Sequence, residues 1–171
     1  MFKKIEVVMP QVDLEKIMGD LTHSYVGGNF QEYNIKDITY LTTLLTNNIR
    51  FGIKPHKVNI TKLVNEGANT PHTDDWPVAL NCYLHAGDDT TFFYTPKTDT
   101  LDHGLRSYKI DDLVIGRSFV AYTGDWYLLE TRQVHNVVSA DKANYRLLLR
   151  FVWGRHSFDE IVNSITVPAK S

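Results

Sequence analysis

The sequence has little cysteine, little net charge and no long apolar run. Cys82 is its one cysteine, which excludes an internal disulfide, and no CxxC or cysteine–histidine tract offers a thiolate metal site. The net charge of −2 and the isoelectric point of about 6.4 argue against a protein that binds phosphate backbones. No stretch approaches the roughly 18 apolar residues of a membrane span, and the apolar start of the chain meets Pro10 too early for a signal peptide. We therefore expect a cytoplasmic protein without a membrane partner, and nothing in the composition supports a nucleic-acid partner.

The remaining composition is that of an ordinary globular protein. The chain has 171 residues, of which 43% are hydrophobic and 22% charged. A chain of this length buries about two thirds of the surface that it exposes when unfolded, so it needs no disulfide or structural metal to form a core. We expect one domain over residues 1–171, in which any metal site serves chemistry rather than folding. The sequence does not indicate an oligomeric state.

Apolar spacing predicts helices at both ends of the chain and strands between them. Asp13 is placed to cap a helix over residues 14–23, residues 36–46 have the spacing of a second helix, and Ser157 and Glu160 have the spacing of a capping box. Between them we predict seven strands, at residues 57–64, 78–85, 90–94, 118–122, 126–130, 134–138 and 145–153. Short strands in this number indicate a sandwich or barrel over about residues 50–153. The polar segment 95–108 is a candidate lid loop.

One histidine has a carboxylate at strand spacing. His72 is followed two positions later by Asp74, and no other histidine has an aspartate at that distance. On a strand, residues i and i+2 project from the same face, so both side chains could bind one metal ion. The pair alone is weak evidence, because in a chain with this many histidines and aspartates a chance pair in a surface turn is the better explanation.

Two later residues strengthen the case for a metal site. His135 lies on a late predicted strand, and Arg146 follows eleven residues later on the next one. Two histidines and one carboxylate on one side of a metal, with three positions open, form the facial triad of non-haem Fe(II) oxygenases. A keto acid can take two open positions and dioxygen the third, while an arginine fork can pair with the keto acid's distal carboxylate.

This order of motifs resembles the 2-oxoglutarate and Fe(II)-dependent dioxygenases, particularly their compact prolyl-hydroxylase-like branch. The resemblance covers about residues 58–153 and implies a mainly β fold, the double-stranded β-helix or jelly roll. By resemblance, the metal ligands and catalytic centre are His72, Asp74 and His135.

The resemblance also implies residues that bind 2-oxoglutarate. The family's arginine falls on Arg146, Tyr83 stands where relatives often use a tyrosine, and Asn81 shares the inward parity of Tyr83. Arg150 has the same strand parity as Arg146 and is the alternative arginine. We favour Arg146 for its distance from His135, which leaves Arg150 as a partner for a buried carboxylate.

One segment differs from the usual pattern of the prolyl-hydroxylase-like branch. Relatives usually carry a Gly-Gly pair before the fourth core strand, whereas this chain has Gly87-Asp88-Asp89. With Trp76 and the loop 95–108, these aspartates predict an acidic, aromatic rim that favours a peptide, an amino acid or another small molecule as substrate.

The resemblance implies hydroxylation of an unactivated C–H bond, with release of succinate and carbon dioxide. Its cofactors would be Fe(II), 2-oxoglutarate and dioxygen, with ascorbate as an optional reductant. Asp74 fills the carboxylate position that related halogenases leave to halide, which favours hydroxylation. Two alternatives stay open: a non-catalytic or differently used, cupin-like metal-binding jelly roll, and a zinc hydrolase, for which Asp75 is the nearest base but projects from the opposite face.

Overall fold

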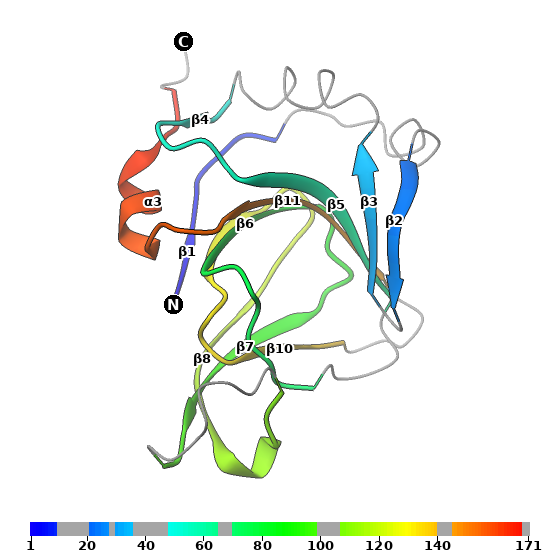
Figure 1. The fold of residues 1–171 in the computed structure, drawn as a ribbon, viewed down its shortest axis with the longest axis vertical. Coiled ribbons are helices and arrows are strands. Elements are labelled where there is room, and N and C mark those ends of the chain that lie inside the picture. Colours follow the sequence, from blue (N-terminus) through cyan, green and yellow to red (C-terminus); the bar gives the residue numbers. More distant parts are fainter. Residues whose placement is uncertain are drawn as a thin grey trace.

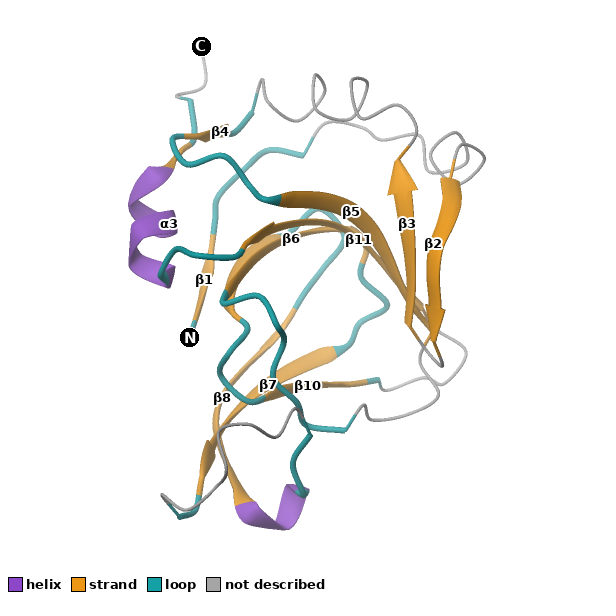
Figure 2. Cartoon of the chain, viewed as in Figure 1, coloured by secondary structure: helices purple, strands orange, loops and turns teal. Residues whose placement is uncertain are grey.

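Two facing antiparallel β-sheets make up most of the structure, a computed structural model (Figures 1 and 2). It describes residues 1–9, 21–27, 30–35, 48–64, 70–98, 107–139 and 145–168. In Figure 1 the large sheet arches above the small sheet, and the C-terminal helix lies at the side near the start of the chain. Within the described ranges, no helix combines the length and the apolar character needed to cross a membrane.

Over the described residues, the large sheet has seven strands and the small sheet has three. Across the large sheet they are β1 (Phe2–Lys4), β9 (Trp126–Glu130), β6 (Val78–His85), β11 (Tyr145–Trp153), β5 (Lys57–Val64), β3 (Phe30–Ile35) and β2 (Leu21–Gly27). Across the small sheet they are β10 (His135–Val138), β7 (Thr90–Pro96) and β8 (Leu113–Val120). The remaining elements are the ladder of β12 (Ile165–Thr166) with β4 (Arg50–Phe51), the 3-10 helix η1 (Ile110–Asp112) and the helix α3 (Phe158–Ser164).

The order of the core strands along the chain confirms the predicted jelly roll. From β5 to β11 the chain alternates between sheets: β5 and β6 lie in the large sheet, β7 and β8 in the small one, β9 in the large, β10 in the small and β11 in the large. Between β5 and β6, His72 forms an isolated antiparallel bridge to the first residue of β10, which extends the small sheet. This arrangement brings segments far apart in sequence together between the sheets.

The central strands agree with the sequence prediction. The bounds of β5, β6, β9 and β11 are those predicted, while β7 runs two residues further and β10 starts one residue later. β8 covers Leu113–Val120, whereas the predicted strand covered residues 118–122. The start was missed because only Leu113 and Phe119 of this strand are buried, so its residues show no alternation of buried and exposed positions. Of the candidate lid, Thr95 and Pro96 belong to β7, and residues 99–106 lie outside the described residues.

The predicted N-terminal helix is wrong at its end. Residues 21–23 begin β2, which pairs with β3, and β3 pairs with β5 through partners such as Tyr33 and Ile60. Strand pairing overrides the helical spacing there. Residues 14–20 of that helix and the whole predicted helix over 36–46 lie outside the described residues.

The C-terminal helix is confirmed, with its capping box. The Ser157 hydroxyl accepts a hydrogen bond from the Glu160 amide, and the Glu160 carboxylate accepts one from the Ser157 amide. Phe158 and Ile161 are the buried residues of α3, and they pack in a cluster with the outer face of the large sheet.

The large sheet separates two apolar clusters. The outer one takes Leu147, Leu149 and Phe151 from β11, whereas the inner one takes Leu148 and includes residues of both sheets. Because side chains alternate along a strand, Arg146 and Arg150 share the inner face with Leu148. Both arginines therefore lie between the sheets.

Candidate metal centre

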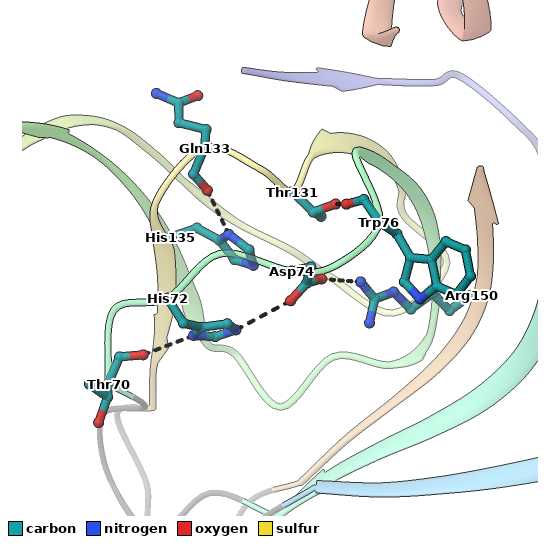
Figure 3. A network of polar contacts seen from close by, with 8 residues as sticks. All are labelled: Thr70, His72, Asp74, Trp76, Thr131, Gln133, His135 and Arg150. Atoms are coloured by element: carbon teal, nitrogen blue, oxygen red, sulfur yellow. Dashed lines mark hydrogen bonds and ion pairs between the residues drawn. The ribbon is translucent and has the colours of Figure 1, made fainter. Parts of the chain in front are cut away.

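Backbone hydrogen bonds bring the two histidines together. The amides and carbonyls of His72 and His135 bond reciprocally, each at 2.9 Å, so the two residues form a hydrogen-bonded antiparallel pair with both side chains on one face. Their ring centroids lie 4.7 Å apart. The Asp74 amide donates to the Thr131 carbonyl at 2.8 Å, which fixes the third side chain beside them. Figure 3 shows the three side chains converging.

The three side chains could hold a metal ion. One possible ligand atom from each of His72, Asp74 and His135 lies within 4.8 Å of the others, and His72 Nε2 is 3.6 Å from Asp74 Oδ1. His135 is buried, whereas 34% of the His72 side chain is exposed. The site is therefore anchored in the core and reached from the His72 side.

Nδ1 of each imidazole forms a hydrogen bond with a backbone carbonyl. Nδ1 of His72 lies 2.8 Å from the Thr70 carbonyl oxygen, and Nδ1 of His135 lies 2.9 Å from that of Gln133 (Figure 3). A carbonyl oxygen can only accept, so each Nδ1 carries the proton of the neutral ring and donates it. This leaves the Nε2 lone pair of each ring as the ligand atom, the arrangement common around metal-bound histidines.

The local electrostatics favour the protonation states that bind metal. Burial lowers the pKa of His135 to about 4, so its imidazole is neutral at physiological pH. Burial alone would raise the pKa of the Asp74 carboxyl, but Arg150, His135 and His72 outweigh it, and the pKa lies below its ordinary value. A neutral imidazole and an ionised carboxylate are the forms that bind a metal.

Arg150 pairs with the carboxylate of the candidate metal centre. Its Nη2 pairs with Asp74 Oδ2, while Asp74 Oδ1 faces His72 (Figure 3). On either side of Arg150 in the sheet stand Asn59 of β5 and Asn81 of β6. Arg150 therefore lies against a partly buried carboxylate, and one carboxylate oxygen is left for a metal.

Replacing Arg150 with methionine should lower the affinity for a divalent metal by about 10- to 100-fold, the usual effect of losing a partner that orients a ligand. The reason is that Asp74 Oδ2 loses its cation and the carboxylate can turn away from the histidines. Calorimetric titration with Ni(II) measures the change. The exposed Arg155, changed in the same way, is the control; equal affinities of the two folded variants would contradict the supporting role.

Arg146 lies deeper and contacts the small sheet. Its side chain is 2% exposed, its Nε lies 2.6 Å from Asp89 Oδ2, and its Nη1 donates to Thr91 Oγ1 at 3.2 Å. Its guanidinium carbon is 5.6 Å from the centre of the Tyr83 ring. Nη2 is buried and has no hydrogen-bond partner among the described residues.

The other predicted cosubstrate ligands line the same interior. Tyr83 is buried, and its hydroxyl hydrogen-bonds with the side chains of Asn81 and Thr91. Burial raises the pKa of Tyr83 despite the nearby Arg146, so the phenol stays neutral and can donate. Asn81 is 7% exposed.

Unpaired polar atoms gather between the sheets. In the part of the chain that the structure describes, the inner face of β5, β6 and β11 carries buried atoms without a hydrogen-bond partner: Asn59 Oδ1, Thr61 Oγ1, Asn81 Oδ1, Arg146 Nη2 and Arg150 Nε. Buried polar groups are normally hydrogen-bonded. Their number beside the triad fits a site for a polar ligand.

The structure corrects the predicted rim and adds Thr91 to the residues around Arg146. Asp89 is completely buried and pairs with Arg146, so it does not belong to an acidic rim, whereas Asp88 is exposed. Thr91, which accepts a hydrogen bond from Arg146 Nη1, carries no signal in the sequence. For Asp89, the one hint in the sequence is that Gly87-Asp88-Asp89 replaces the Gly-Gly pair of the resembled family. No local pattern shows that the Asp89 side chain turns inward.

Comparisons with known proteins establish a likeness of fold. No family model and no curated protein matches the chain. HygX from Streptomyces hygroscopicus, crystallised with nickel, 2-oxoglutarate and hygromycin B, superposes with a TM-score of 0.50 at 11% identity, over 88% of this chain and 81% of HygX. This likeness supports the jelly-roll fold.

Two further solved structures are more distant. The α-ketoglutarate-dependent epimerase SnoN from nogalamycin biosynthesis has a TM-score of 0.47 at 13% identity, over 81% of this chain and 68% of SnoN. Vicilin from hazelnut, Corylus avellana, has a TM-score of 0.45 at 12% identity, over 78% of this chain. The chain spans 31% of the vicilin chain.

Proposed function

We propose that this protein is a 2-oxoglutarate- and Fe(II)-dependent dioxygenase that hydroxylates an unactivated C–H bond. The observation that carries the proposal is the convergence of His72, Asp74 and His135, with both Nδ1 atoms bonded to backbone and one Asp74 oxygen paired with Arg150. Membership of the prolyl-hydroxylase-like branch is part of the same prediction. The HygX structure, which has a similar fold and contains nickel and 2-oxoglutarate, supports the proposal.

The donor set fits a non-haem iron. Nε2 of both histidines and one carboxylate oxygen of Asp74 would bind the metal on one side and leave its other positions for ligands. When bound, the metal would couple the oxidative decarboxylation of 2-oxoglutarate by dioxygen to oxidation of the substrate. Burial keeps Nε2 of His135 unprotonated, and Arg150 helps to keep the Asp74 carboxyl ionised and holds its orientation.

The interior fits a dicarboxylic keto acid. Arg146 Nη2 is a buried donor without a partner in the described ranges, and the centre of the Tyr83 ring lies 5.6 Å from the carbon of the same guanidinium. Arg146 and Tyr83 would bind the distal carboxylate, with Asn81 beside them. The surrounding inner cluster, which includes Phe93 and Leu148, excludes bulk water.

The substrate would approach from the exposed side of His72. Its reacting carbon would reach the open metal positions there, since His135 is buried and its ring stacks on Phe93, with the ring centroids 5.7 Å apart. Asp88 is exposed and Trp76 is partly exposed, which is compatible with a peptide, an amino acid or another small molecule.

Anaerobic addition of Fe(II) and 2-oxoglutarate tests the function. We expect the weak visible charge-transfer band of a keto acid chelated to iron, and succinate on admission of oxygen. Succinate offered in place of 2-oxoglutarate is the control, because it lacks the keto group and should give no band. No band and no succinate from protein with verified iron content would refute the enzyme assignment.

A metal-binding jelly roll without a keto-acid cosubstrate is the second candidate. The Arg146–Asp89 pair favours it, since this pair balances the buried guanidinium charge without any ligand. In that case Ni(II) or Zn(II) would bind, and 2-oxoglutarate would change neither the metal affinity nor the spectrum.

A further inference from the structure

We infer that Asp89 is a positioning residue, which orients the Arg146 guanidinium toward the distal carboxylate of the keto-acid cosubstrate. The inference rests on the proposed function, and it assigns to Asp89 a role in selecting keto acids that carry a second carboxylate. Asp89 itself would not touch the cosubstrate, because its Oδ2 lies against Arg146 Nε.

The backbone around Asp89 turns its carboxylate inward. Gly87 and Asp88 both have positive φ angles, 69° and 53°, in the left-handed region that a non-glycine residue such as Asp88 seldom adopts. This turn joins β6 of the large sheet to β7 of the small one. Asp89, next in the chain, is completely buried.

The contacts of Arg146 define which of its donors faces the interior. A guanidinium is planar, so contacts at two of its nitrogens determine where the third points. Asp89, which directly precedes β7, lies against Nε, and Thr91 of β7 accepts a hydrogen bond from Nη1. The Tyr83 ring lies near the guanidinium, and Nη2 remains buried without a protein partner in the described part of the chain. A hydrogen-bond acceptor on a ligand would give Nη2 the partner that it lacks.

The charges fit a dianionic ligand. Arg146 and Asp89 cancel each other, and so do Arg150 and Asp74. Bound Fe(II) would then supply the net positive charge of the interior, and its two charges match the two carboxylates of 2-oxoglutarate. Because Asp89 neutralises its charge, Arg146 would bind the distal carboxylate mainly through hydrogen bonds. The orientation of the guanidinium therefore matters.

The sign of the change in affinity separates positioning from simple charge balance. Asp89→Asn keeps the size of the side chain but removes the charge that attracts Nε. If Asp89 only balanced charge, this variant would bind 2-oxoglutarate more tightly, because the Arg146 cation would no longer be neutralised. If Asp89 positions Arg146, the variant binds 2-oxoglutarate more weakly.

Titration of the anaerobic Fe(II) protein with 2-oxoglutarate and with pyruvate, followed by the charge-transfer band, is the experiment. For Asp89→Asn we expect the dissociation constant for 2-oxoglutarate to rise about 10-fold. The constant for pyruvate should be unchanged, since this keto acid has no distal carboxylate to reach Arg146. A purely structural defect would weaken both ligands alike.

Unchanged or tighter binding of 2-oxoglutarate, or equal losses for the two keto acids, would overturn the inference. If Asp89→Asn does not fold, Thr91→Val decides, because it removes the Nη1 contact and keeps the shape of the side chain. It should weaken 2-oxoglutarate alone by a smaller factor, and no change would overturn the inference. If the proposed function itself is wrong, the unmodified protein gives no charge-transfer band with either keto acid. This result is distinct from the outcomes that overturn only the role of Asp89.

Discussion

Replacing His72 or His135 with alanine should lower the affinity for a divalent metal by more than about 100-fold, beyond the loss expected for residues that only orient a ligand. Each change removes one of the converging ligand atoms and leaves a histidine and Asp74, which can no longer bind a metal on three sides. Calorimetric titration with Ni(II), together with the visible spectrum of the Co(II) protein, measures the loss.

The matched control is His156→Ala. His156 precedes α3 and is not part of the converging set, so this variant should bind metal like the unmodified protein. Full metal binding by His72→Ala would show that the ligand assignment is wrong. Far-ultraviolet circular dichroism of each variant separates a lost ligand from a lost fold.

Arg146→Met should lower the affinity for 2-oxoglutarate by about 100-fold while leaving metal affinity nearly unchanged. The methionine removes the buried donor that would meet the distal carboxylate, but it touches none of the three candidate metal ligands. The variant should also lose roughly 3–5 kcal/mol of unfolding free energy, because Asp89 becomes a buried charge without its cation. Band titration and urea unfolding measure the two effects.

A double variant separates these two effects. Arg146→Met combined with Asp89→Leu removes both charges, so it should recover much of the stability without recovering affinity for 2-oxoglutarate. Arg150→Met is the converse control, with weakened metal binding. Loss of 2-oxoglutarate affinity in Arg150→Met at unchanged metal affinity, with no loss in Arg146→Met, would reverse the choice of arginine.

The central strands could be predicted because each carries its own signal. β5, β6, β9 and β11 are rich in β-branched, aromatic and other apolar residues and are bounded by turn residues. β8 lacks the signal, since it is an edge strand with most of its side chains exposed, and its start was misplaced. β2 was misassigned at residues 21–23, where helical spacing competes with pairing to a distant part of the chain.

The candidate site also has a part that local sequence predicts and a part that it does not. The spacing of His72 and Asp74 is local, so the sequence alone indicates that both side chains can face one ion. By contrast, the placement of His135 opposite His72 depends on a backbone pair between segments far apart in the chain. No local pattern contains that information.

By itself, the sequence determined the central strands β5, β6, β9 and β11, the capped C-terminal helix and the residue types of a candidate metal site. Only the tertiary structure decided the partners of the two inward arginines. Arg146 and Arg150 lie on one strand with the same parity, so local spacing makes them equivalent. They differ because Asp74 lies against one and Asp89 against the other, and which carboxylate meets which arginine depends on the packing of one sheet over the other.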